Sequence, residues 1–242
     1  MLFKFNTMKK SLFTTLFITI FFLISIQSNA QTYTLKFKTN YGNFKVMLYD
    51  FTPNHRDLIL KEVEKGTYKK ALFNRVIKNF VVQGGELDDV ILEQEAKLNI
   101  EKPIRLAPEF NPKAFHKIGA LGAGRDDNST KGSFLNQIYF VVGKRVNEID
   151  LELLEQKKGV KFTAEQRAEY LKNGGQPRLD HDYTIFGEIT KGLPIIMNIS
   201  KVDTDYTDLP EDPVIFTIKV KKNLPKKVKR TSISAGLGIG HR

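Results

Sequence analysis

The chain has 242 residues, a formal net charge of +11 and no cysteine. With 41% hydrophobic and 27% charged residues, it has the composition of a globular protein of one or at most two domains. The lack of cysteine excludes disulfides, a thiolate nucleophile and cysteine-based metal sites.

Residues 1–30 have the three-part pattern of a secretory signal peptide. Three lysines precede an apolar run from Leu12 to Ile26, and Ser28-Asn29-Ala30 then offers small residues at a cleavage site. The apolar run is shorter than the roughly 20 residues of a membrane-spanning helix, which favours a signal over an uncleaved anchor. We therefore expect export, with the periplasm of a Gram-negative bacterium as the destination.

The positive charge is confined to the two ends of the chain. Residues 1–30 hold three lysines and no acidic residue, and residues 219–242 hold eight basic side chains and no acidic one. The stretch between them is neutral, whereas a nucleic-acid-binding domain carries basic charge on its fold. We expect no nucleic-acid partner. Residues 221–242 are expected to be a disordered basic tail that could contact an anionic membrane weakly.

The first elements after residue 30 are predicted to be a hairpin and a helix. Alternating runs over Tyr33–Phe37 and Phe44–Leu48 flank an Asn- and Gly-containing turn, which predicts two paired β-strands. Pro53 then opens a helical stretch over His55–Lys65, and Gly66 is placed to end it.

The rest of the domain, residues 31–220, alternates short strands with loops. Residues 86–115 are polar and contain three prolines, so we expect a loop there. Residues 147–177 are rich in Glu, Lys, Gln and Leu and predict a helical insertion. We interpret it as an inert surface elaboration, and the alternative is that it restricts or extends the site, because it directly precedes Leu179. Many short strands and two short helices predict a barrel rather than a parallel α/β sheet. Strands are expected over Leu72–Ile77, Phe80–Gln83, Gln137–Val142, Thr184–Glu188 and Val214–Val220, and the second short helix over Ile195–Ile199.

The familiar catalytic and metal-binding patterns are missing from the sequence. The four histidines have no metal-ligand spacing, and no Gly-x-Ser-x-Gly elbow occurs. Asp180-His181-Asp182 is interpreted as an exposed turn, since adjacent strand residues point to opposite faces. Gly119–Gly124 lacks the glycine spacing of a dinucleotide site. We expect neither a metal nor a cofactor.

An unusual arginine lies in the string from Phe73 to Gly85. Strand alternation places Arg75 on the face of Phe73, with Asn74 and Val76 on the other face. An arginine between apolar neighbours needs an acceptor or solvent. The pattern alone favours an edge arginine in a surface ion pair.

The string from Phe73 to Gly85 resembles the central signature of the cyclophilins. The resemblance continues in the same order over Tyr33 to Val220, and it implies an eight-stranded antiparallel barrel capped by two helices. It also implies an enzyme that catalyses rotation about Xaa-Pro bonds of polypeptides, with its proline pocket on the outer face of the barrel. We expect the protein to be a monomer. The other segments that carry the resemblance are Tyr41–Phe44, Ala107–Phe110, His116–Arg125, Gln137–Val141 and Leu179–Glu188.

The resemblance also implies the site residues, with Arg75 as the catalytic arginine. Three residues stand between Gly132-Ser133 and Gln137, Arg178 replaces a common tryptophan, and Tyr183 replaces a common histidine. The chain is thus expected to be an exported isomerase that assists protein folding, with a non-catalytic peptide-binding module as the alternative. The substrate-binding residues implied by the resemblance are Phe80, Val82, Gln83, Gly124, Arg125, Gln137, Tyr139, Leu179 and Tyr183.

Overall fold

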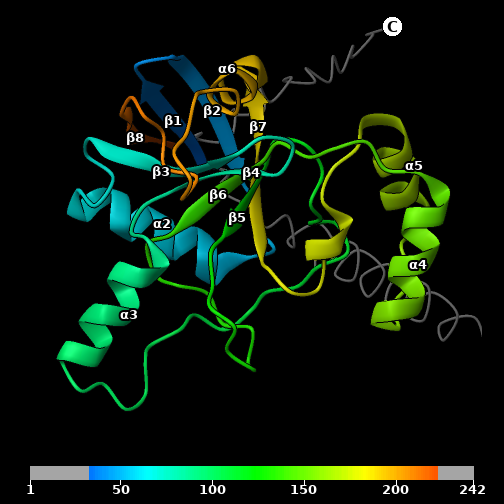
Figure 1. Ribbon diagram of the computed structural model, residues 1–242, viewed down its shortest axis with the longest axis horizontal. Coiled ribbons are helices and arrows are strands. Elements are labelled where there is room, and N and C mark those ends of the chain that lie inside the picture. The colour runs from blue at the N-terminus through cyan, green and yellow to red at the C-terminus, as the bar shows by residue number, and fades with distance from the viewer. Residues whose placement is uncertain (1–32, 223–242) are drawn as a thin grey trace, which may run out of the picture. The chain divides into compact units, whose positions relative to one another are not determined.

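Eight short antiparallel strands close into a barrel in the computed structural model, which describes residues 33–222 (Figure 1). The strand order around the barrel is β1-β2-β7-β5-β6-β4-β3-β8. The predicted fold class is therefore confirmed. The strands are β1 (Tyr33–Thr39), β2 (Gly42–Leu48), β3 (Ala71–Ile77), β4 (Val81–Gly84), β5 (Ala120–Ala123), β6 (Ile138–Val141), β7 (Ile185–Lys191) and β8 (Val214–Lys222).

The predicted signal segment and most of the basic tail, residues 1–32 and 223–242, lie outside the described residues. Between residues 33 and 222, no helix has the length and apolar character needed to cross a membrane.

Aromatic side chains fill the interior of the barrel. Phe37 stacks on Phe44 at 4.6 Å between ring centroids, and Phe73 stacks on Phe216 at 4.3 Å. Phe140 meets both Phe37 and Phe44 edge-on at 5.2 Å. These rings are at most 1% exposed, so the interior is a packed core rather than a ligand channel. A binding site on this barrel must lie on its outside.

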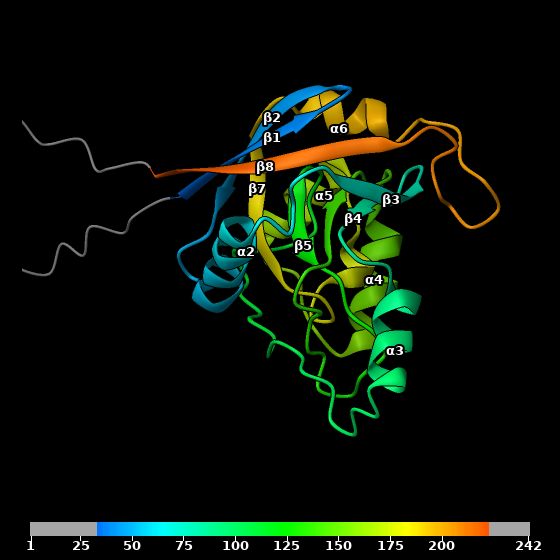
Figure 2. The ribbon, with the colours of Figure 1, turned by 90° about the vertical axis from the view of Figure 1, so that its left-hand side faces the viewer.

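Two helices lie at opposite ends of the barrel (Figures 1 and 2). They are α2 (Pro53–Lys65) and α6 (Leu193–Ile199). Ile59 of α2 and Ile196 of α6 belong to the same buried cluster as the barrel interior. Gly66 ends α2 in the left-handed conformation at φ 88°, as predicted from its position.

A third helix, α3 (Asp88–Lys97), replaces part of the loop that was expected over residues 86–115. That expectation was wrong because no residue of α3 is buried, so the segment lacks the apolar periodicity that reveals a helix. Acidic residues in its first turn and Lys97 in its last turn match the helix dipole, which was the available signal.

The predicted helical stretch forms α4 (Glu148–Lys158) and α5 (Ala164–Asn173), beside the barrel and away from α3 (Figure 1). Reciprocal capping boxes begin both helices. The two helices have a small core of their own, which includes Leu151, Phe162 and Tyr170 and also contacts Phe115 before β5.

The predicted alternation along β3 was wrong. Phe73 and Val76 are 1% and 3% exposed and both face the interior, although three positions separate them. The pairing of β3 with β4 shifts register between Phe73 and Arg75, as in a β-bulge, and this resets which side chains point inward. Asn74 and Arg75 therefore both reach the outside of the barrel.

Candidate active site

A cleft of about 910 Å³ lies on the outside of the barrel over β3, β4 and β6. Residues from separate parts of the chain converge there, from Asn74 on β3 to Leu209 before β8. Nine of the ten predicted site residues line this cleft, and they are Arg75, Phe80, Gln83, Gly124, Arg125, Gln137, Tyr139, Leu179 and Tyr183.

Val82 is the predicted site residue that the structure places elsewhere. Its side chain is 0% exposed and packs in the barrel interior with Phe140. Side chains alternate along β4, so Val81 and Gln83 face the cleft while Val82 faces the core. The assignment of Val82 to substrate binding was therefore wrong, and Val81 takes its place in the cleft wall.

Arg75 reaches the cleft with its side chain 37% exposed. Its Nε lies 3.6 Å from Oδ2 of Asp208, a residue of the loop before β8. The backbone N–H of Val76 donates to the Asp208 carbonyl at 2.8 Å, which holds this loop against β3. The ion pair expected from the pattern alone is therefore present, and Arg75 lines the cleft together with Thr207 and Leu209, the neighbours of Asp208. Gln83 is directly opposite Arg75 on β4.

Apolar and aromatic side chains form the pocket next to Arg75. Tyr139 and Leu179 are 3% and 6% exposed, and the ring of Tyr183 meets Tyr139 edge-on at 6.1 Å. The Arg178 guanidinium lies 4.3 Å from the centre of the Phe80 ring. A cation over an aromatic face is attracted by the ring quadrupole, so Arg178 extends this wall where many relatives were expected to have tryptophan. Sequence reasoning noted Arg178 without assigning it to the site.

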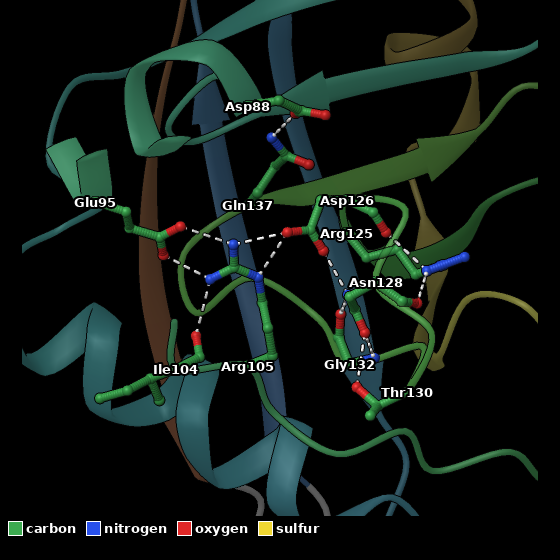
Figure 3. A network of polar contacts seen from close by, with 10 residues as sticks. All are labelled: Asp88, Glu95, Ile104, Arg105, Arg125, Asp126, Asn128, Thr130, Gly132 and Gln137. Carbon is green, nitrogen blue, oxygen red and sulfur yellow. Dashed lines mark hydrogen bonds and ion pairs between the residues drawn. The ribbon is translucent and has the colours of Figure 1, made fainter. Parts of the chain in front are cut away.

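Gln137 also lines the cleft, and its side chain is held by hydrogen bonds, one of them to Asp88 (Figure 3). Its side-chain Nε2 donates to the Glu86 carbonyl at 2.9 Å and to the Asp88 carboxylate at the start of α3. An amide nitrogen carries two hydrogens, so these contacts use both and leave Oε1 as the atom that accepts. A Cβ atom on Gly124 would lie 1.7 Å from that oxygen, which explains the glycine there.

We expect Gly124→Ala to lower kcat/KM about tenfold or more, because the added methyl must displace the Gln137 amide, and a misplaced group near a reacting bond costs rate. The measurement is isomerisation of a short Xaa-Pro peptide. In a Gln137→Ala background the methyl has no amide to displace, so Gly124→Ala should add little. A single variant with wild-type activity would contradict this account of Gly124.

Helix α3 forms one wall of the cleft and is tied to the opposite loop by Arg105 (Figure 3). The Arg105 side chain is 8% exposed and bonds to Glu95 of α3 at 2.6 and 2.9 Å and to Asp126 at 2.7 and 3.1 Å. The Glu95 and Asp126 carboxylates raise the pKa of Arg105, so it is always charged. Asp126 follows Arg125, so this contact braces the loop that borders the cleft. The cleft residues contributed by α3 and the residue before it are Leu87, Asp88, Asp89 and Leu92.

The Tyr139 hydroxyl lies 2.7 Å from Nε2 of His116, a residue that does not line the cleft. Burial raises the pKa of Tyr139, so the hydroxyl keeps its proton. Nδ1 of His116 lies 2.6 Å from Oδ1 of Asp180, which is 4% exposed. The expectation of an exposed turn was therefore wrong for Asp180, because its carboxylate is used inside the protein. The single-strand alternation rule did not apply there, since Asp180 follows a 3-10 turn over Pro177–Leu179.

A Ser-His-Glu arrangement occurs at the start of α2. Nε2 of His55 lies 3.1 Å from the Ser133 hydroxyl, and its Nδ1 lies 2.7 Å from Glu109. Glu109 also accepts from the backbone N–H groups of Asn54 and His55, so it caps α2. Burial lowers the pKa of His55. Ser133 is 1% exposed and beyond the reach of a substrate carbonyl, so this network is structural rather than hydrolytic. Within residues 33–222, no group of three His, Asp or Glu side chains could hold a metal ion.

Residues 34–220 match the family model described as cyclophilin type peptidyl-prolyl cis-trans isomerase. The chain belongs to this family. The resemblance seen in the sequence is thus confirmed, and this cyclophilin carries the isomerase activity of its family (EC 5.2.1.8).

Curated relatives are ascribed the same activity, and solved structures share the fold. The cyclophilin is 28% identical over 200 residues to a protein of Staphylococcus saprophyticus that is ascribed the same activity, covering 81% of this chain and 96% of the relative. It is also 28% identical over 187 residues to a Streptococcus pyogenes protein that is ascribed both phosphatase and peptidyl-prolyl isomerase activity. This match covers 76% of the chain but 37% of that longer protein. A Cryptosporidium parvum cyclophilin shares the fold at a TM-score of 0.56 and 18% identity, covering 80% of this chain and 99% of its own.

Proposed function

We propose that this cyclophilin accelerates rotation about Xaa-Pro bonds in exported polypeptides, with Arg75 as the catalytic residue. The observation that carries the proposal is the position of the Arg75 guanidinium in the same cleft as a pocket of Phe80, Tyr139 and Leu179. A proline ring fits such an apolar pocket, and the bond to be rotated then lies beside the guanidinium.

Rotation about an Xaa-Pro bond needs neither a nucleophile nor a proton transfer. The barrier is about 20 kcal/mol because the amide is conjugated. When the bond twists, the proline nitrogen becomes pyramidal and gains a lone pair. A fixed guanidinium donates to that lone pair better than to a planar amide nitrogen, so it binds the twisted state more tightly than the ground state.

Gln137 supplies a holding point for the peptide in the same cleft. Gln137 presents Oε1 beside Gly124, where this oxygen can accept a hydrogen bond from a substrate backbone N–H. The pocket holds the proline ring and Gln137 holds the neighbouring backbone. The free side of the Xaa-Pro bond can then turn against a fixed partner. A family structure from C. parvum was solved in the presence of the dipeptide Ala-Pro, which supports proline-containing peptides as the substrate class.

Export is proposed from the sequence of residues 1–30, with the periplasm as the destination. Cell fractionation of the full chain and of a variant starting at Gln31 tests this proposal. We expect the full chain in the periplasmic fraction, shortened at its N-terminus, and the variant in the cytoplasm. Equal distribution of the two proteins would overturn the proposed location.

The activity is tested on residues 31–242 by exchange NMR or a protease-coupled assay with a short Xaa-Pro peptide. We expect the protein to raise the exchange rate in proportion to its concentration. A protein that binds the peptide without raising the rate would instead be the non-catalytic binding module considered above. A protein that does neither would overturn both readings of the cleft.

A further inference from the structure

A chain of buried hydrogen bonds runs from α5 to the wall of the cleft. The Tyr170 hydroxyl donates to Oδ2 of Asp180 at 2.5 Å. Oδ1 of Asp180 accepts from the His116 backbone N–H at 2.9 Å and lies 2.6 Å from its Nδ1. The chain ends at the Tyr139 hydroxyl, 2.7 Å from Nε2 of His116. All four residues are at most 4% exposed.

The partners determine the direction of these hydrogen bonds. Burial and the nearby Asp180 carboxylate raise the pKa of Tyr170, so its hydroxyl keeps its proton and donates. An ionised carboxylate only accepts, which assigns the imidazole proton to Nδ1 of His116. Nε2 of His116 is then the ring atom that bonds to the Tyr139 hydroxyl. Each group thus fixes the orientation of the next.

Tyr139 has little freedom apart from this contact. A Cβ atom on Gly122 would lie 2.2 Å from Cζ of Tyr139, so the ring lies close against the backbone of β5. The His116 ring lies nearly parallel to it at 6.0 Å. The hydroxyl bond to His116 therefore sets how deeply the ring lies in the cleft wall.

The α4–α5 helix pair has a second attachment to the same wall. Nζ of Lys158, in the last turn of α4, donates to the carbonyls of Arg178 and Asp180 and to the Asp182 carboxylate at 2.5–2.7 Å. These residues flank Leu179 of the proline pocket. The helix pair thus contacts the cleft wall at two places, through Tyr170 and through Lys158.

We propose that the α4–α5 pair positions the proline pocket, with Tyr170, Asp180 and His116 as positioning residues that act through the Tyr139 hydroxyl. The interpretation of this segment as an inert elaboration is replaced by this role. The proposal rests on the isomerase function of the cleft. Because the pocket holds the proline ring both before and during rotation, a loosened wall should weaken binding more than it slows turnover.

The test is a double-mutant cycle on the full mature chain with Tyr170→Phe, Tyr139→Phe and the double variant. We expect each single variant to raise KM roughly threefold to tenfold, the worth of one buried hydrogen bond, with kcat nearly unchanged. Tyr170→Phe should add nothing in the Tyr139→Phe background, because the connection is already broken. Glu155→Gln is the matched control: it disturbs the helix pair at Lys161, Phe162 and Arg167, and should lower stability without changing KM.

Two results would overturn the positioning role. The first is a Tyr170→Phe variant with wild-type KM, and the second is equal KM increases for Tyr170→Phe in both backgrounds. An inactive wild-type protein would instead overturn the isomerase assignment. In that event peptide affinity, measured by NMR titration of the same four proteins, replaces KM and decides the positioning role by the same comparison.

Discussion

Arg75→Ala is expected to lower kcat/KM for Xaa-Pro isomerisation by about 100- to 1000-fold, the usual cost of removing a donor aimed at a transition state. Arg75 is on the outer side of β3 and 37% exposed, so its loss creates no cavity in the core. The fall should be mainly in kcat, because the guanidinium acts on the twisted bond rather than on the bound proline. Exchange NMR at several peptide concentrations separates kcat from KM.

Two further variants separate position from charge at Arg75. Arg75→Lys keeps the charge but loses the planar fork of donors, so most of the activity should still be lost. Asp208→Asn removes the partner 3.6 Å away and keeps the side chain's shape, so we expect a smaller effect, about threefold or less for an exposed pair. Activity retained by Arg75→Ala, with an unchanged fold by circular dichroism, would remove Arg75 from the mechanism.

Phe140→Ala is expected to lower the free energy of unfolding by about 3–5 kcal/mol, the usual cost of a large cavity in a core. Phe140 is 0% exposed and meets Phe37 and Phe44 edge-on, so its removal leaves a cavity beside both rings. Denaturant unfolding measures the change. Phe110, which is 40% exposed, provides the control, and Phe110→Ala should cost less than about 1 kcal/mol.

A loss of similar size in both variants would mean that the barrel interior is not the main source of stability. A loss confined to Phe140→Ala would support the aromatic core as its source. The free energies of unfolding are compared at one temperature and pH. The slope of free energy against denaturant must also be the same in all variants, so that a shift of the midpoint reports a change in stability.

The barrel could be predicted because several of its strands have a clear local sequence pattern. The alternating runs around Asn40–Asn43 and the apolar run over Gln137–Val142 mark strands whose two faces differ or are both buried. Helix α3 has no such apolar pattern, since none of its residues is buried and polar contacts hold it in place. Apolar periodicity in a sequence arises from a buried helix face, so a helix without buried residues has no such periodicity.

The site was predictable as a set of residues but not in its detail. Motif order placed nine of the ten residues in one cleft. Val82 failed because one residue of strand register turns a side chain from the cleft to the core. The contribution of Asp180 and His116 was invisible because they lie 64 positions apart and meet through folding alone. Hydrogen bonds between distant side chains have no local sequence pattern.

The closing strand of the barrel has a consequence for how the chain reaches this state. β8 lies between β1 and β3, with Phe37 opposite Ile218 and Phe73 opposite Val214. A chain that has not yet delivered residues 214–222 therefore carries two unpaired strand edges, one at each side of the gap. Such edges recruit other strands, so incomplete chains are the aggregation-prone species and the last strand to emerge removes the hazard. Barrel closure also joins residues about 180 positions apart, which makes it the slow step expected of a fold rich in distant pairings.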